Sequence, residues 1–210
     1  MKSTAPSFVT KVEEVIAGSG EDRLAIVRLP DRTVFVVADG AGGVVAGAAA
    51  AEAICDAVVT RCERDTPHSW AEWLEDLDRR MPRGGFAAAV VVELGHDGRI
   101  SGASAGDCQA WLFAAGLATE LTADQCRKPL LGEGKSIPVG FEAHAGACVL
   151  LLATDGLWKY ASRIHVADVA AFRPLEDAAS VLVEGVRLKS GALQDDIALV
   201  LCELLGDAER

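Results

Sequence analysis

The sequence predicts an α+β fold, a four-layer α-β-β-α sandwich of two antiparallel sheets flanked by helices. The expected elements run in the order strands, two helices, strands, two helices and a final strand. Short turns between neighbouring strands favour antiparallel pairing. Most strands are apolar on both faces, so both faces must be covered. Two packed sheets between two helical layers satisfy all three observations.

Eight segments have the apolar, β-branched character of strands. They are residues 7–17, 24–29, 34–38, 86–94, 99–105, 108–114, 147–153 and 197–204. Turns at residues 18–20 and 31–32 lie at hairpin spacing, so the opening strands are expected to pair antiparallel with one another. Gly106 and Asp107 interrupt two strand-like runs, which indicates a bend that aims Asp107.

Four segments are predicted to be helices. They are the alanine-rich residues 44–64, residues 69–81 with Ser69 as the N-cap, and residues 165–172 and 175–188. Residues 122–145 show no apolar period and carry Arg127, Lys128 and Lys135. A loop this long is usually functional or disordered.

Composition excludes several classes of protein. The 210 residues fit one domain, 1–210, and the formal net charge of −11 argues against nucleic acid or an anionic membrane as partner. Six scattered cysteines without a CxxC pair argue against a disulfide framework or a zinc site. With no signal-like N-terminus and no membrane-length apolar run, we expect a soluble, cytoplasmic protein.

Carboxylates recur at five strand edges. They are Glu21 with Asp22, Asp39, Asp107, Asp155, and Asp195 with Asp196. Clustered carboxylates repel one another unless a cation lies between them. Oxygen-only ligands favour Mg²⁺ or Mn²⁺ over zinc. Two such ions close together suit phosphate ester hydrolysis, because they acidify and orient a water and neutralise phosphoryl charge.

The chain resembles the metal-dependent protein phosphatases of type 2C, as a small bacterial-type member. The matching pieces occur in the family's order and span almost the whole chain. They are Glu21-Asp22, the run from Val37 to Gly43 that contains Asp39-Gly40, Gly106-Asp107, Thr154-Asp155-Gly156-Leu157-Trp158, and Asp195-Asp196.

The resemblance implies a two-metal site between the sheets that holds Mn²⁺ or Mg²⁺. Asp39 would bridge both ions, Asp155 and Asp195 would hold one, and the Gly40 carbonyl would touch the other. Asp22 would act through water with Glu21 beside it, and Asp107 would help to hold a third, weaker ion. Asp39, Asp155 and Asp195 carry catalysis in this reading, with Asp196 next to them. Phosphoserine or phosphothreonine in a protein would be hydrolysed through a metal-bridging water, in partnership with a Ser/Thr kinase.

Two departures from the family pattern bear on the substrate. Ala17 stands where many members have an arginine that binds phosphate, and the segment between Asp107 and Asp155 is short. We expect Arg127 and Lys128, in the long segment, to bind the substrate phosphate instead. Three functions therefore stay open: a phosphoprotein phosphatase, a pseudophosphatase that serves as a regulatory binding module, and a metallohydrolase of a small phosphoester.

Overall fold

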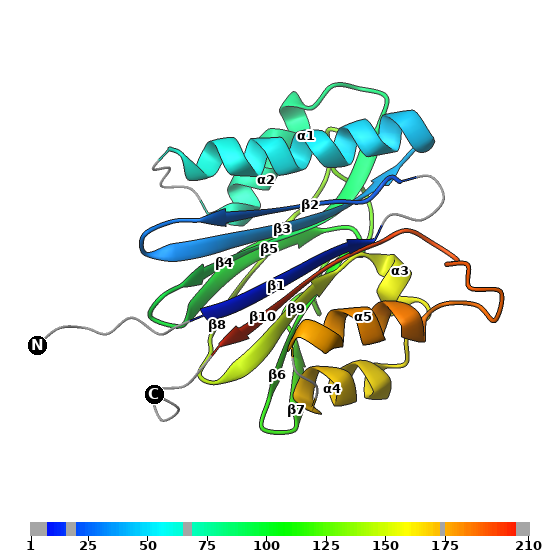
Figure 1. Cartoon of the computed structure of the whole chain (residues 1–210). Coiled ribbons are helices and arrows are strands. Elements are labelled where there is room, and N and C mark those ends of the chain that lie inside the picture. Colours follow the sequence, from blue (N-terminus) through cyan, green and yellow to red (C-terminus); the bar gives the residue numbers. More distant parts are fainter. Residues whose placement is uncertain (1–7, 16–19, 65–68, 173–174, 205–210) are drawn as a thin grey trace, which may run out of the picture.

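Two five-stranded antiparallel sheets pack face to face between layers of helices (Figure 1). The computed structural model describes residues 8–15, 20–64, 69–172 and 175–204. Sheet A has the order β1 (Phe8–Val15), β10 (Ile197–Leu204), β9 (Cys148–Ala153), β6 (Gln109–Ala114), β7 (Leu117–Glu120). Sheet B has the order β2 (Arg23–Arg28), β3 (Arg32–Ala41), β4 (Phe86–Gly95), β5 (Arg99–Ala105), β8 (Val139–His144).

Helices cover the outer faces of both sheets, so the four-layer prediction is confirmed (Figure 1). Helices α1 (Val44–Cys62) and α2 (Trp70–Arg80) lie on sheet B, and α4 (Arg163–Phe172) and α5 (Leu175–Gly185) lie on sheet A. Each interface between layers has its own apolar cluster. Ser69 caps α2 in a reciprocal capping box with Glu72, as its position in the sequence predicted.

The expected hairpin between the first two strands is wrong. β1 pairs with β10 in sheet A, whereas β2 pairs with β3 in sheet B. The chain therefore passes from one sheet to the other before β2, and Glu21 and Asp22 lie just before β2. A second crossing, at residues 106–108, carries Asp107 from β5 of sheet B to β6 of sheet A.

The segment predicted to lack regular structure contains an edge strand. β8 pairs with β5 and alternates half-buried and exposed side chains along its length. The alternation is short and includes Gly140, which hid it within residues 122–145. The predicted strand at residues 34–38 is also longer, because Asp39, Gly40 and Ala41 continue the ladder with β4. Asp39 therefore lies within β3 rather than after it.

The acidic residues of sheet B gather at one end of the sheet. Ala38 pairs with Arg23, so the end of β3 lies beside the start of β2. Asp39 pairs with Ala88, and the next residue of β4 pairs with Ala105 at the end of β5. Asp22, Asp39 and Asp107 are thereby brought to the same end of sheet B.

Sheet A brings its acidic residues to the matching end. Ala153, the last residue of β9, pairs with Leu199 near the start of β10 and with Gln109 at the start of β6. Asp155 follows β9 directly, and Asp195 and Asp196 precede β10. Because the crossing from β5 to β6 takes only three residues, the acidic ends of the two sheets lie together.

The contact between β3 and α1 is made by two glycines. A Cβ on Gly40 would lie 2.3 Å from the carbonyl carbon and oxygen of Gly47, which are backbone atoms of α1. The helix can therefore pack directly on the strand that carries Asp39. The turn between them passes through Gly42 and Gly43 at φ of 103° and 100°, values that favour glycine.

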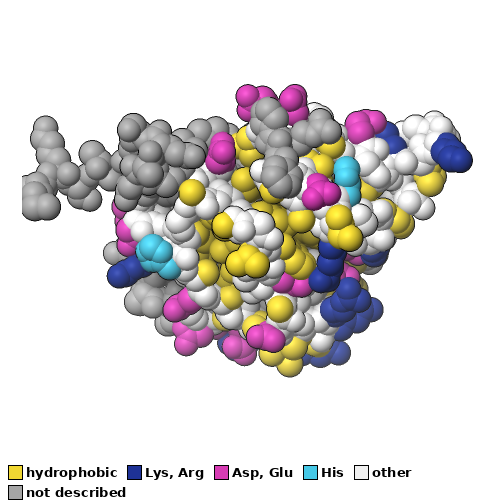
Figure 2. All heavy atoms as spheres, turned by 90° about the horizontal axis from the view of Figure 1, so that it is seen from below, with side chains coloured by type: hydrophobic (Ala, Val, Ile, Leu, Met, Phe, Trp, Pro, Cys, Tyr) yellow, Lys and Arg dark blue, Asp and Glu magenta, His cyan; other side chains and the backbone are white. Residues whose placement is uncertain are grey.

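The face on the side of α4 and α5 is not fully covered by polar groups. Ile164 of α4 and Leu117 of β7 are exposed at 76% and 73%. Figure 2 views the molecule from below and shows hydrophobic side chains gathered near the middle of this face. In the described part of the chain, no helix combines the length and apolarity needed to cross a bilayer.

The glycine contact predicts a large effect of Gly40→Ala. The added methyl would clash with rigid backbone of α1 rather than with a movable side chain. We expect a loss of about 3 kcal/mol in the free energy of unfolding, measured by urea denaturation. Gly146→Ala is the control, because nothing lies within 4 Å of a Cβ at that position. Equal stability of the two variants would show that the packing of α1 on β3 is looser than described.

Candidate metal centre

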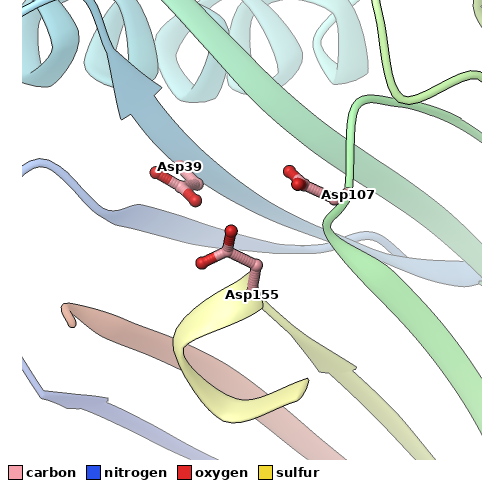
Figure 3. A group of neighbouring side chains, drawn as sticks. All are labelled: Asp39, Asp107 and Asp155. Atoms are coloured by element: carbon pink, nitrogen blue, oxygen red, sulfur yellow. The ribbon is translucent and has the colours of Figure 1, made fainter. Parts of the chain in front are cut away.

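Three aspartates from distant parts of the chain face one another where the sheets meet (Figure 3). Asp39 comes from β3, Asp107 from the crossing after β5, and Asp155 from the first residue of the short helix α3 (Asp155–Trp158). One carboxylate oxygen from each lies within 4.8 Å of the other two. Three of the carboxylates selected from sequence are therefore brought together.

Asp22 is the most deeply buried carboxylate of the group, with 1% of its surface exposed. Its Oδ2 atom has no hydrogen-bond partner among the described residues. The pKa of Asp22 is raised to about 7, chiefly by burial; the Thr154 side chain opposes the shift, and the nearby charges of Asp196, Asp155 and Asp195 add to it. A buried carboxylate with an unsatisfied oxygen is a strong candidate for a cation ligand.

Burial and neighbouring negative charge also raise the pKa of Asp39. Its pKa is raised to about 8, first by burial and then by the charges of Asp22, Asp155, Asp107 and Asp195. The pKa of Asp155 is also raised by burial, against a lowering hydrogen bond from Lys159. These carboxylates therefore cannot all be charged at neutral pH without a cation between them.

The cluster fits a hard divalent ion. Mg²⁺ binds oxygen at about 2.0–2.1 Å, so ligands on opposite sides of the ion lie about 4.2 Å apart. The spacing of the Asp39, Asp107 and Asp155 oxygens, within 4.8 Å, is close to this value. Neither His nor Cys belongs to this group, so the donor set is oxygen alone. Gly40 is buried beside Asp39 on β3 and can offer its carbonyl oxygen.

One cation of the protein already reaches into the site. The Lys159 Nζ atom lies 2.5 Å from Asp155 Oδ2 and 3.2 Å from Asp195 Oδ2. Burial acts to lower the pKa of the Lys159 ammonium, but its contacts with Asp155 and Asp195 together outweigh this and raise it. Sequence reasoning missed Lys159, although its place four residues after Asp155 in a helical turn is the spacing of a helical ion pair.

The start of β10 is tied to the crossing before β2. The Glu21 N–H donates to Asp196 Oδ2 at 2.6 Å, and the Asp196 N–H donates to Asp195 Oδ1 at 3.1 Å. Asp196 is buried. Asp196 and Glu21 thus join the two sheets beside the cluster, while the Asp195 side chain turns to Lys159.

The segment from Thr154 to Trp158 fixes the direction of Asp155. The Ala198 N–H donates to Thr154 Oγ1 at 2.9 Å, and the Trp158 Nε1–H donates to the Ala153 carbonyl at 3.0 Å. A Cβ on Gly156 would lie 1.9 Å from the Asp196 carbonyl oxygen, so only glycine fits there. The motif is therefore a packing unit that holds Asp155 against β10.

Arg127 and Lys128 are exposed on a segment that is attached next to the site. The Gly106 N–H donates to the Cys126 carbonyl at 2.9 Å, which places Arg127 one residue from the anchor beside Asp107. The rest of the segment is held by the buried Asp78 of α2. Its carboxylate accepts hydrogen bonds from the backbone N–H groups of Gly132, Gly134 and Ser136. This role of Asp78 was not anticipated from sequence. Ala17, the position that lacks the family's phosphate-binding arginine, lies outside the described residues.

One cavity lies elsewhere in the described structure. It measures about 740 Å³ and is lined partly by Arg32, Arg61, Glu93 and Trp70 beneath α1 and α2. Arg32 is at the far end of β3 from Asp39. Glu93 pairs with Arg32 and accepts a hydrogen bond from Trp70, and Arg61 stacks on Trp70, so these groups contact one another. The carboxylate cluster, not this cavity, has the chemistry of a catalytic centre.

The family model described as Stage II sporulation protein E (SpoIIE) matches residues 30–205. The chain belongs to the SpoIIE family. No curated protein sequence matches it significantly. The matched region includes Asp39, Asp107, Asp155, Asp195 and Asp196 and begins after Glu21 and Asp22. The resemblance predicted from the motifs is confirmed at the level of fold and family.

Solved structures of two phosphatases and of RsbX share the fold seen here. The serine/threonine phosphatase of S. agalactiae aligns with a TM-score of 0.76 at 16% identity, over 94% of this chain and 98% of that one. The catalytic domain of PstP, in complex with two manganese ions, gives 0.72 at 16%, over 95% and 98%. RsbX in complex with magnesium gives 0.73 at 16%, over 94% of each chain.

The raised pKa values of Asp22 and Asp39 predict a pH-dependent stability in the absence of metal. The folded state holds protons that the unfolded state releases, so the stability contributed by these two groups is fully present below about pH 4 and is lost as pH rises through 7 to 8. With a chelator present, melting temperature should therefore decrease between pH 5 and pH 8.5. Asp39→Asn, which cannot ionise, should reduce this slope. A flat or rising profile in the wild type would contradict the burial of these charges.

Proposed function

We propose that this SpoIIE-family protein is a metal-dependent phosphatase that hydrolyses phosphoserine and phosphothreonine in proteins. The observation that carries the proposal is the convergence of Asp39, Asp107 and Asp155, whose oxygens lie within 4.8 Å of one another. The relatives support the same reading, since PstP is a serine threonine protein phosphatase solved with manganese and RsbX was solved with magnesium.

The chain's own oxygens would hold two divalent cations and a third, weaker one. We assign Asp22, Asp39, Asp107, Asp155 and Asp195 as ligands, with the Gly40 carbonyl. Glu21 and Asp196 hold this set in place through the backbone contact between them. When bound, the cations supply Lewis acidity that polarises the phosphoryl group and acidifies water. The buried, mutually repelling carboxylates supply the negative charge that selects cations over anions at this position.

The substrate phosphate needs a cationic contact, because the aspartates repel it. We assign this contact to Arg127 and Lys128, which are exposed and lie next to the Cys126 anchor. A guanidinium binds two phosphoryl oxygens at once, which makes Arg127 the stronger candidate. The backbone anchors at Cys126 and Asp78 limit the motion of the segment that carries both residues.

The compartment and the partner enzyme that we propose follow from the chemistry of the protein and its substrate. None of the six cysteines forms a disulfide and five of them are buried, a pattern that suits a reducing compartment such as the cytoplasm. A phosphoserine substrate must first be made by a Ser/Thr protein kinase, so we also propose that the protein works opposite such a kinase. The chain 1–210 would form one phosphatase domain.

Turnover of phosphopeptides should require both Mn²⁺ and Asp39. We expect the purified protein with Mn²⁺ to release phosphate from phosphoserine and phosphothreonine peptides, and Asp39→Asn to lower kcat by at least about 100-fold. Asp76→Asn is the control, because Asp76 is exposed on α2 and pairs with Arg79. Its kcat should match the wild type.

The same assay separates the alternative functions. Hydrolysis of a chromogenic small phosphoester, without hydrolysis of any phosphopeptide, would identify a small-molecule metallohydrolase. Binding of Mn²⁺ by calorimetry without turnover of any phosphoester would identify a regulatory pseudophosphatase. Either result would replace the proposal.

Arg127→Ala should raise KM for phosphopeptides several-fold while leaving Mn²⁺ affinity unchanged, because the substitution removes a phosphate contact and no metal ligand. Lys135→Ala is the matched control, since Lys135 lies on the same segment and pairs with Glu133. Steady-state kinetics and Mn²⁺ calorimetry on both variants check this. Identical KM values for Arg127→Ala and wild type would remove Arg127 from the substrate site.

A further inference from the structure

Lys159 occupies the carboxylate pair assigned to one of the metal ions. Its ammonium lies 2.5 Å from Asp155 Oδ2 and 3.2 Å from Asp195 Oδ2. These are two of the carboxylates that we assigned above as metal ligands. The other side of the cluster, formed by Asp39 and Asp107, has no such contact with a lysine or arginine among the described residues.

The position of Lys159 is fixed by the fold. Its backbone N–H donates to the Asp155 carbonyl at 2.8 Å, which closes the turn of α3 and directs the side chain back along the helix. Trp158, the preceding residue, is held by its hydrogen bond to Ala153 and by stacking on Trp111 at 5.7 Å. The ammonium therefore meets Asp155 in a defined place.

This contact differs from an ordinary surface ion pair. Exposed pairs contribute little, because water screens them and two flexible side chains must be ordered. Here Lys159 and Asp195 are 49% and 41% exposed, but the Asp155 side chain is only 11% exposed and lies among carboxylates that raise its pKa, so the difference rests on the contact with Asp155. The positive charge of Lys159 opposes the rise in the pKa of Asp155, and it contacts Asp195 as well, so it relieves repulsion at this pair of carboxylates.

We propose that Lys159 is a built-in cation that competes with a divalent metal ion for Asp155 and Asp195. In the metal-free protein the ammonium neutralises this pair and stabilises the fold. A divalent ion that binds the same oxygens must displace the ammonium, because the two positive charges repel at such short range. One metal position is thereby weakened selectively, and its occupancy depends on metal concentration. The inference rests on the proposed metal site and adds a regulatory feature to it.

The test uses Lys159→Gln, which keeps a polar side chain of similar length and removes the charge. Isothermal calorimetry with Mn²⁺ should show the weaker binding event tightened by about tenfold or more, the size of one charge-assisted hydrogen bond, with the tighter event unchanged. Lys159→Arg keeps the charge and should leave the weaker event weak. Lys135→Gln is the matched control, because its ammonium pairs with Glu133 away from the cluster.

The melting temperature gives a second readout, and the substitution is expected to act on it in opposite ways without metal and with saturating Mn²⁺. In a chelator, Lys159→Gln should melt below the wild type and below Lys135→Gln, since the carboxylates lose their internal cation. On addition of saturating Mn²⁺, the melting temperature of Lys159→Gln should rise by more than that of the wild type does. These melts do not depend on catalytic activity.

Each outcome has a defined meaning. Equal Mn²⁺ affinities in Lys159→Gln and wild type overturn the competition while the proposed metal site stands. A lower affinity in Lys159→Gln also overturns it, because Lys159 would then support the ligands. Absence of Mn²⁺ binding in both proteins overturns the metal site and the competition together.

Discussion

Repulsion among buried carboxylates is the constraint on which the rest of this structure depends. The chain crosses between its sheets four times, and two of these crossings, before β2 and after β5, bring acidic residues to the same end of the sandwich. Burial and neighbouring charge raise the pKa of Asp39 to about 8, so ionising all the carboxylates at this end is unfavourable without a cation. A cation is what makes the arrangement favourable, and Lys159 supplies one within the chain itself.

The surrounding contacts hold the carboxylates in place against this repulsion. Thr154 bonds to Ala198, the Glu21 backbone bonds to Asp196, and Gly156 packs on the Asp196 carbonyl, so β9, β10 and the approach to β2 are locked together. Gly40 lets α1 pack directly on β3 from the other side. The functional end of the molecule is therefore positioned by backbone contacts that do not involve the ligand oxygens.

Local sequence patterns predicted the features of the fold that depend on neighbouring residues in the chain. Apolar strands ending near Asp39 and Asp155, the cap at Ser69 and the layer order all follow from short-range periodicity and turn residues. The pairing of β1 with β10, rather than with β2, depends on residues about 190 positions apart in the chain, which no local pattern records. Lys159 and Asp78 were missed for a related reason: each looks like an ordinary helical charge until the partner segments are placed beside it.

The central claim is that the carboxylate cluster binds divalent cations. A crystal structure of the protein grown in Mn²⁺, with an anomalous difference map measured at the manganese edge, tests it most directly. The account predicts anomalous peaks among Asp39, Asp107 and Asp155, with the Lys159 ammonium displaced wherever an ion contacts both Asp155 and Asp195. A map with no peak at the cluster, in a crystal that holds manganese elsewhere, would contradict it.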